Sequence, residues 1–132
     1  DRTLRRCGRA HTVADVFSAV SRTLAAGLKP HVDFIFGLPG ETEEDLKSTI
    51  NAIRELAAMG GMIHAHTFMP LPQTGLAAEP PGKISGRLRP VLKELIRRGS
   101  LYGIWHKQGA EGLGQGSAGQ GHPRSNPGAV SQ

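Results

Sequence analysis

The sequence has little of what a disulfide-bonded, membrane-spanning or base-stacking protein needs. Its single cysteine, Cys7, excludes an internal disulfide and any multi-cysteine metal site formed by this chain alone. No apolar run approaches the ~18 residues that a transmembrane helix requires, so we expect no membrane-spanning segment. Aromatic residues make up only 5% of the chain and are not interleaved with the basic ones, as stacking on nucleic-acid bases would require. The chain does not begin with methionine, and we expect it to be part of a longer protein.

The remaining composition is that of a small basic domain followed by a different C-terminal segment. Hydrophobic residues make up 38% and charged residues 20%, which is typical of a folded rather than a disordered chain. The 16 Lys and Arg outnumber the 11 Asp and Glu, and the net charge of +5 favours polyanionic partners. From Gln108 onward the chain is rich in glycine and almost uncharged. We therefore expect one folded domain over residues 1–107 and a disordered Gly-rich tail over 108–132.

Helix and strand signals alternate through the expected domain. Thr12 and Thr42 are each followed three residues later by an aspartate, which predicts a capping box at the start of a helix. Gly27 and Gly60 predict where these two helices end. Short connections between alternating elements are typical of a parallel α/β arrangement, but two clear strands are too few for a closed barrel. In chain order, the pattern predicts helix 12–27, strand 31–37, helix 42–60, strand 62–69 and helix 88–98.

The strand 31–37 and the turn after it carry the most informative pattern. Asp33, Ile35 and Gly37 share one face of this strand, while the two phenylalanines between them take the other face and need helices to cover them. Burying an unpaired carboxylate is costly, so we expect Asp33 to meet a cation or hydroxyl donors. Gly37 would permit close approach of a ligand, and Gly40 would permit a tight turn before the next helix.

A phosphate-binding loop is the obvious competitor at this strand-to-helix turn. The pattern of Gly, four residues and then Gly-Lys-Ser/Thr is absent from the sequence. Glu41, Glu43 and Glu44 would also repel a phosphate at the start of the helix. The face that carries Asp33 is therefore left for a different ligand.

The segment 33–45, Asp-Phe-Ile-Phe-Gly-Leu-Pro-Gly-Glu-Thr-Glu-Glu-Asp, resembles the fifth-strand motif of radical S-adenosylmethionine (radical SAM) enzymes. Two weaker segments agree in order, because 9–12 resembles the stretch after the fourth strand and 68–74 resembles the turn after the sixth. The resemblance covers residues 1–107. It implies the C-terminal strand-helix units of an incomplete, TIM-like (β/α) radical SAM barrel, whose N-terminal half lies outside this chain.

The resemblance implies that the strand and its turn bind the adenosyl part of S-adenosylmethionine. Asp33 would hold the ribose hydroxyls, while Ile35 and the backbone at the strand end would flank the adenine. The implied cofactor-binding residues are Asp33, Ile35, Gly37, Leu38, Pro39 and Gly40.

The resemblance also implies a 4Fe-4S cluster, which three cysteines in a CxxxCxxC motif hold and which cleaves S-adenosylmethionine reductively to a 5′-deoxyadenosyl radical. Cys7 alone cannot hold such a cluster, so its ligands would lie outside this chain. We expect the isolated chain to be inactive, and we assign it no catalytic residue. The parent enzyme would transfer methyl or methylthio groups. Such a cluster implies a reducing compartment, and we expect the cytoplasm.

Finer features resemble two branches of this family. His64-x-His66-x-Phe68 and the stretch from Tyr102 to Trp105 are most similar to members with an N-terminal cobalamin-binding domain, which would add cobalamin as a cofactor. The run Gly-Glu-Thr-Glu-Glu-Asp is very similar to that of the tRNA methylthiotransferases, which would make tRNA the substrate. We expect both histidines and Phe68 to line a substrate pocket, and Tyr102 and Trp105 to pack on the last helix.

Two other functions remain open. The first is a fragment of a metal-dependent hydrolase barrel, because His64 and His66 are two apart on one strand face, as zinc ligands are in some barrel hydrolases. No third ligand has suitable spacing, so a pocket or a hydrogen-bonded pair is favoured and no metal site is predicted. The second alternative is a non-catalytic basic module for nucleic acid, which would act through arginines such as Arg97 and Arg98.

Overall fold

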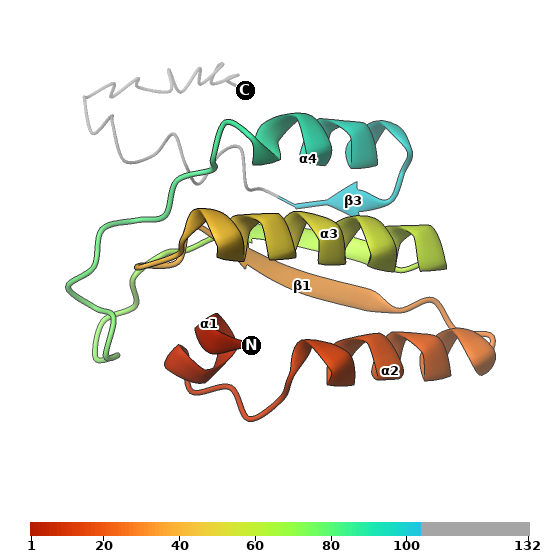
Figure 1. The fold of residues 1–132 in the computed structure, drawn as a ribbon, viewed down its shortest axis with the longest axis horizontal. Helices are drawn as coiled ribbons and strands as arrows, with labels where there is room; N and C mark the ends of the chain where they lie inside the picture. Colours follow the sequence, from red (N-terminus) through yellow and green to blue (C-terminus); the bar gives the residue numbers. More distant parts are fainter. Residues whose placement is uncertain (104–132) are drawn as a thin grey trace, which may run out of the picture.

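The computed structural model of the protein describes residues 1–103 (Figure 1). The five predicted helices and strands are confirmed, and their ends lie within two residues of the prediction. A short helix at the start and a short strand at the end were not predicted, because elements of five and two residues show no periodicity. Trp105, the domain boundary at residue 107 and the tail 108–132 lie outside the described residues. The elements are α1 (Arg2–Arg6), α2 (Val13–Ala25), β1 (His31–Phe36), α3 (Glu43–Met59), β2 (Met62–Thr67), α4 (Leu88–Arg97) and β3 (Leu101–Tyr102).

Both predicted capping boxes are present. The Asp15 carboxylate accepts from the Thr12 N–H at 2.7 Å, and the Asp45 carboxylate accepts from the Thr42 N–H at 2.9 Å. Each threonine hydroxyl in turn accepts from the aspartate N–H, so the box pairs backbone donors that the first helical turn leaves free. Gly60 ends α3 with φ of 105°, a left-handed conformation that glycine adopts without strain.

The strands form one parallel sheet in the order β1-β2-β3. β1 pairs with β2 along its whole length, from His31 opposite Met62 to Phe36 opposite Thr67. β3 adds two further pairs near the start of β2. Residues 1–103 therefore form a mixed α/β unit around a small parallel sheet, and these residues do not close a barrel.

The hydrophobic core lies between one face of the sheet and the helices α2, α3 and α4. Figure 1 shows α3 running along the sheet, with α4 next to it and α2 on the side of β1. Ile53 of α3, Ile63 of β2 and Leu92 of α4 have no exposed surface. Burying one such side chain contributes about 1.5–3 kcal/mol. The rest of the core is Val20, Phe36, Leu46, Leu56, Ala65, Ile84, Leu88, Val91, Leu95 and Leu101.

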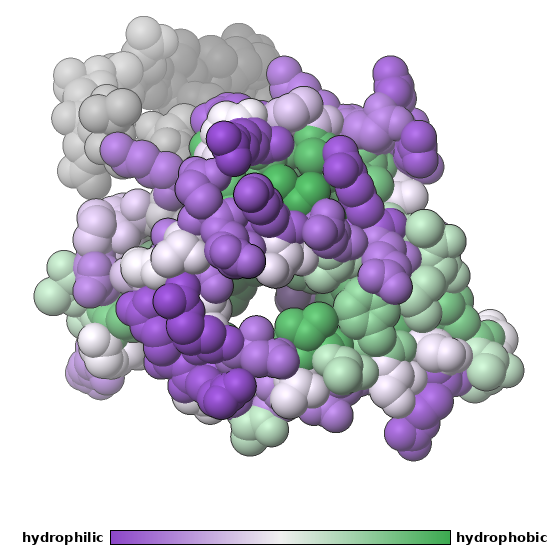
Figure 2. All heavy atoms as spheres, viewed as in Figure 1, coloured by the Kyte–Doolittle hydropathy of each residue, from purple (hydrophilic) through white to green (hydrophobic). Residues whose placement is uncertain are grey.

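The surface of the helical layer is polar at one end and more hydrophobic at the other. Figure 2 shows hydrophilic side chains crowded around α1, and hydrophobic ones at the right of the view, where α2 and α3 end. Leu28 and Met59, which follow and end these helices, are 65% and 36% exposed. None of the helices in residues 1–103 combines the length and the apolar character that crossing a membrane would need.

Candidate functional site

The sheet face opposite the core carries polar side chains. Alternation places Asp33 and Ile35 on this face, and the register places His64 opposite Asp33 and His66 opposite Ile35. Asp33 and Ile35 are exposed, whereas both histidines are half-buried. The next residue along β1, Phe36, is only 1% exposed on the other side, which confirms the predicted alternation. We call this surface the open face, and its residues are His31, Asp33, Ile35, Met62, His64, His66 and Tyr102.

Three side chains of the open face meet at one point. His64 Nδ1 lies 2.7 Å from Asp33 Oδ1, and His66 Nε2 lies 3.0 Å from His64 Nδ1. His66 Nε2 is also 3.5 Å from Asp33 Oδ1. The Asp33 side chain remains 72% exposed. The partners of this carboxylate within residues 1–103 are therefore two imidazoles, and the site has room for a ligand above it.

The sequence offered no third residue with suitable spacing to His64 and His66, but the structure brings Asp33 beside them. Asp33 Oδ1, His64 and His66 offer ligand atoms that all lie within 4.8 Å of one another. The sequence search considered spacing along one strand, but Asp33 comes from the neighbouring strand. The signal that could have found it is the parallel pairing of two strands whose polar residues share a face.

The sequence led us to expect Tyr102 to pack on the last helix, and this is wrong. Its ring stacks on His64, with ring centroids 4.4 Å apart and planes 10° apart. Its hydroxyl lies 3.0 Å from Nδ1 of His31. The reason is the register of β3, which places Tyr102 opposite His64 and on the open face. Tyr102 therefore fixes the orientation of one ring of the cluster.

Phe68, which was expected to form a pocket with the two histidines, is buried under another segment of the chain. Its side chain is only 8% exposed. Its N–H donates to Phe36 O and its carbonyl accepts from Gly82 N–H, both at 2.8 Å. The segment near Gly82 thus folds over Phe68.

The turn after β1 is packed against the chain itself. Gly37 has φ of 74°, and a Cβ added there would lie 2.6 Å from the Lys83 backbone nitrogen. The close approach expected of Gly37 is therefore made by this loop. Leu38 and Pro39 are half-buried, and the Leu38 carbonyl accepts from Glu41 N–H at 3.1 Å.

Glu41 is a residue of this turn that the sequence did not single out as part of a site. Burial raises the pKa of its carboxyl group, and the nearby charge of Asp45 raises it further. A hydrogen bond from the Gly37 N–H acts in the opposite direction. Glu41 thus fastens the end of the turn to its beginning, directly beside the predicted cofactor-binding residues.

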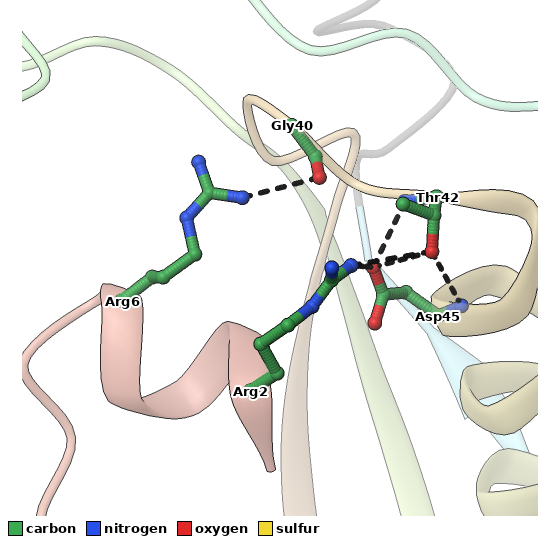
Figure 3. Close-up of polar contacts among 5 residues, drawn as sticks. All are labelled: Arg2, Arg6, Gly40, Thr42 and Asp45. Atoms are coloured by element: carbon green, nitrogen blue, oxygen red, sulfur yellow. Dashed lines mark hydrogen bonds and ion pairs between the residues drawn. The ribbon is translucent and has the colours of Figure 1, made fainter.

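The helix α1 holds the far side of this turn through two arginines (Figure 3). Arg6 donates to the carbonyl of Gly40 at 3.1 Å. Arg2 donates to Asp45 Oδ2 at 2.5 Å and to the Thr42 hydroxyl at 3.3 Å. Hydrogen bonds from Thr42, first its N–H and then its hydroxyl, together with Arg2, lower the pKa of Asp45 to about 2. Gly40 is exposed. Besides its expected role in a tight turn, it accepts this hydrogen bond from Arg6.

The basic side chains of α4 are partly neutralised. Glu94 receives hydrogen bonds from both Arg97 and Arg98, the latter at 2.7 Å. Between α3 and α4 lies a cavity of about 650 Å³, whose lining includes Arg54 and Arg87. These arginines are outside the open face, so any basic binding surface would be distinct from the Asp33 site.

Comparison with known proteins gives a family and several relatives. Residues 1–53 match the sequence model of the Radical SAM superfamily. The chain is 36% identical over 103 residues to the threonylcarbamoyladenosine tRNA methylthiotransferase MtaB of Treponema pallidum. It is 34% identical over 87 residues to a tRNA-2-methylthio-N(6)-dimethylallyladenosine synthase of a Jannaschia species, and 35% identical over 82 residues to an uncharacterized protein of Methanopyrus kandleri.

These matches cover much of this chain but little of the relatives. They include 74%, 64% and 61% of this chain, in the same order, but only 21%, 18% and 16% of the relatives. The chain thus spans about a fifth of the length of the curated relatives that it matches. No solved structure gives a significant match.

Proposed function

Because this chain belongs to the radical SAM superfamily, we propose that it forms the part of a radical SAM barrel that binds the adenosyl group of S-adenosylmethionine. One observation carries the proposal: the family match includes β1, and β1 presents an exposed carboxylate and an exposed aliphatic side chain on the same face of the sheet. Asp33 accepts hydrogen bonds from the ribose hydroxyls, and Ile35 provides an apolar surface for the adenine.

The turn residues act mainly by supporting this surface. Since the space beside Gly37 is filled by the loop at Lys83, the proposed contact to the adenine is made by Ile35 and by the backbone at Leu38. Pro39 and Gly40 shape the turn, and Arg6 holds it from the side of α1. The adenosine therefore lies over the carboxyl end of β1, which is where parallel strands usually present ligand contacts.

The chain does not fit a 4Fe-4S cluster. Such a cluster needs several thiolates, and Cys7 is the single cysteine of the sequence. In our proposal the cluster, and with it the reductive cleavage to a 5′-deoxyadenosyl radical, depends on the N-terminal half of the barrel, outside this chain. The isolated chain therefore binds the adenosyl group but does not cleave S-adenosylmethionine.

We propose methylthio transfer to tRNA as the reaction of the parent protein. The names of two relatives support this, because both are enzymes of tRNA methylthiolation by name. A net charge of +5 suits a polyanionic substrate. The proposed reaction does not include cobalamin, because none of the three relatives is named for it. Retention of tRNA on filters at several salt concentrations tests the substrate, and absence of binding at low salt contradicts it.

Titration of the 132-residue chain with S-adenosylmethionine tests the adenosyl site. We expect Asp33→Ala to weaken binding by about 1–3 kcal/mol, because a charge-assisted hydrogen bond is lost. Glu55→Ala, which removes an exposed carboxylate on α3, is the control and keeps the original affinity. Equal affinities of Asp33→Ala and the unchanged chain contradict the assignment. Production of 5′-deoxyadenosine by the isolated chain would contradict the proposal that the cluster lies elsewhere.

A further inference from the structure

Three side chains of the open face bring potential metal-ligand atoms together. His64 Nδ1 lies 2.7 Å from Asp33 Oδ1 and 3.0 Å from His66 Nε2. His66 Nε2 lies 3.5 Å from the same carboxylate oxygen. Imidazole nitrogens and carboxylate oxygens are the donor atoms that transition-metal sites use, and these three are within reach of a single ion.

A bound cation would satisfy the three atoms together. Two imidazole nitrogens and one carboxylate oxygen would each donate a lone pair to it. A tetrahedral metal about 2.0–2.1 Å from each ligand separates the ligand atoms by about 3.3 Å. The three separations here are 2.7, 3.0 and 3.5 Å, so side-chain adjustments of less than 1 Å would form the site.

The surroundings also suit a metal with an open coordination position. The cluster lies on the open face, and Asp33 is 72% exposed, so a fourth ligand can approach from outside. Tyr102 stacks on His64 and restricts the orientation of its ring. The ligands come from two paired strands, whose spacing is fixed by the sheet.

We propose that Asp33, His64 and His66 bind a divalent transition-metal ion. Two imidazoles and one carboxylate favour ions such as Zn²⁺ or Fe²⁺ over Mg²⁺ or Ca²⁺, which prefer oxygen ligands. The site goes beyond the proposed adenosyl function, because it requires the two histidines of β2 and shares only Asp33 with the adenosyl contacts. A metal there would offer its open position to a substrate oxygen or nitrogen, and would be distinct from any cluster held by cysteines.

Equilibrium dialysis of the full 132-residue chain against Zn²⁺, with Mg²⁺ as a second probe, tests the site. We expect one tightly bound zinc and no comparable binding of Mg²⁺. His64→Ala and His66→Ala should each weaken zinc binding by at least about 100-fold, the upper end of what loss of an outer-shell partner costs. His11→Ala is the matched control, because His11 is exposed and lies before α2, away from the cluster. It should bind zinc like the unchanged chain.

Two further readouts separate this site from a structural role and from the adenosyl site. Zinc should shift the ring-proton NMR signals of His64 and His66 but not those of His11, while circular dichroism shows that each variant is folded. S-adenosylmethionine binding measured with a chelator present should persist in His64→Ala. Unchanged zinc affinity in both histidine variants, or equal affinity for Mg²⁺, overturns the metal site whatever the result for S-adenosylmethionine. If Asp33→Ala loses S-adenosylmethionine binding, that result concerns the adenosyl site. The metal site is still judged by the zinc and Mg²⁺ affinities of the histidine variants.

Discussion

The two faces of the sheet are made by alternate residues of the same strands, yet their chemistry is opposite. On the covered face, Phe36, Ile63 and Ala65 are at most 1% exposed and pack beneath the helices. On the open face, Asp33 and Ile35 are exposed and meet polar side chains of β2. Adjacent residues of one strand therefore belong to a hydrophobic core and to a polar site.

This contrast indicates that stability and binding are assigned to different faces. Burial of apolar surface is the main favourable term in folding, and here it is concentrated between the sheet and the helices. Side chains on the open face contribute little burial and can serve a ligand. Substitutions on the two faces should therefore affect different measurements, and the largest effects on stability are expected on the covered face.

Isoleucine occurs on both faces, and substituting it gives the largest expected difference in stability. Ile63→Ala removes a side chain with no exposed surface, and we expect a loss of about 2–5 kcal/mol in the free energy of unfolding. Ile35→Ala removes a side chain that is 45% exposed, and we expect a change of about 0.5 kcal/mol or less. Urea unfolding of the two variants measures both. Similar losses in the two variants would contradict the division between the faces.

A pair of glycines should sharpen the comparison at the end of β1. Gly37 and Gly27 both have φ of 74°, so alanine is strained equally at the two positions. At Gly37 the new Cβ also meets the backbone at Lys83, whereas nothing lies within 4 Å at Gly27. We expect Gly37→Ala to be more destabilising than Gly27→Ala by about 1–3 kcal/mol, the usual cost of overpacking.

Thermal or urea unfolding of both glycine variants measures this difference. If the two variants lose the same stability, the loop at Lys83 does not pack against the turn as described. The space beside Gly37 would then be available to a ligand, and the contact to adenine expected from the sequence would regain its support.

The elements that the sequence predicted correctly are those specified by neighbouring residues. The box of Thr42 and Asp45 and the stop at Gly60 act within one or two helical turns, so their spacing in the sequence is enough to find them. Alternation along β1 is equally local, and it placed Asp33 and Phe36 on opposite faces.

The cluster on the open face could be predicted only in part. The pairing of Asp33 with His64 joins residues 31 apart in the chain, and it depends on the strand order and on the register. Tyr102 joins them through a strand of two residues, which is too short to give a pattern. The sequence identified Asp33 and the two histidines separately, but only the sheet brings them together.

The smallest expected effect concerns the helix start that supports the covered face. Asp45 caps α3 and also meets Arg2, whereas Asp15 makes the same capping box at α2. We expect Asp45→Asn to lower the free energy of unfolding by about 1 kcal/mol at neutral pH, the usual value of a capping interaction. Asp15→Asn is the matched control, and its loss should be smaller because no arginine contact is removed with it.

The pH dependence of this loss has a definite sign. The fold lowers the pKa of Asp45 from 3.8 to about 2, because hydrogen bonds from Thr42 and then Arg2 favour the charged carboxylate. The stabilisation is therefore fully present above the unfolded pKa of 3.8 and disappears as the pH falls through about 2. Urea unfolding at a series of pH values should show the unchanged chain and Asp45→Asn converging over this interval. A stability difference that stays constant down to the lowest pH would mean that the Asp45 carboxylate is not what fastens α3 to α1.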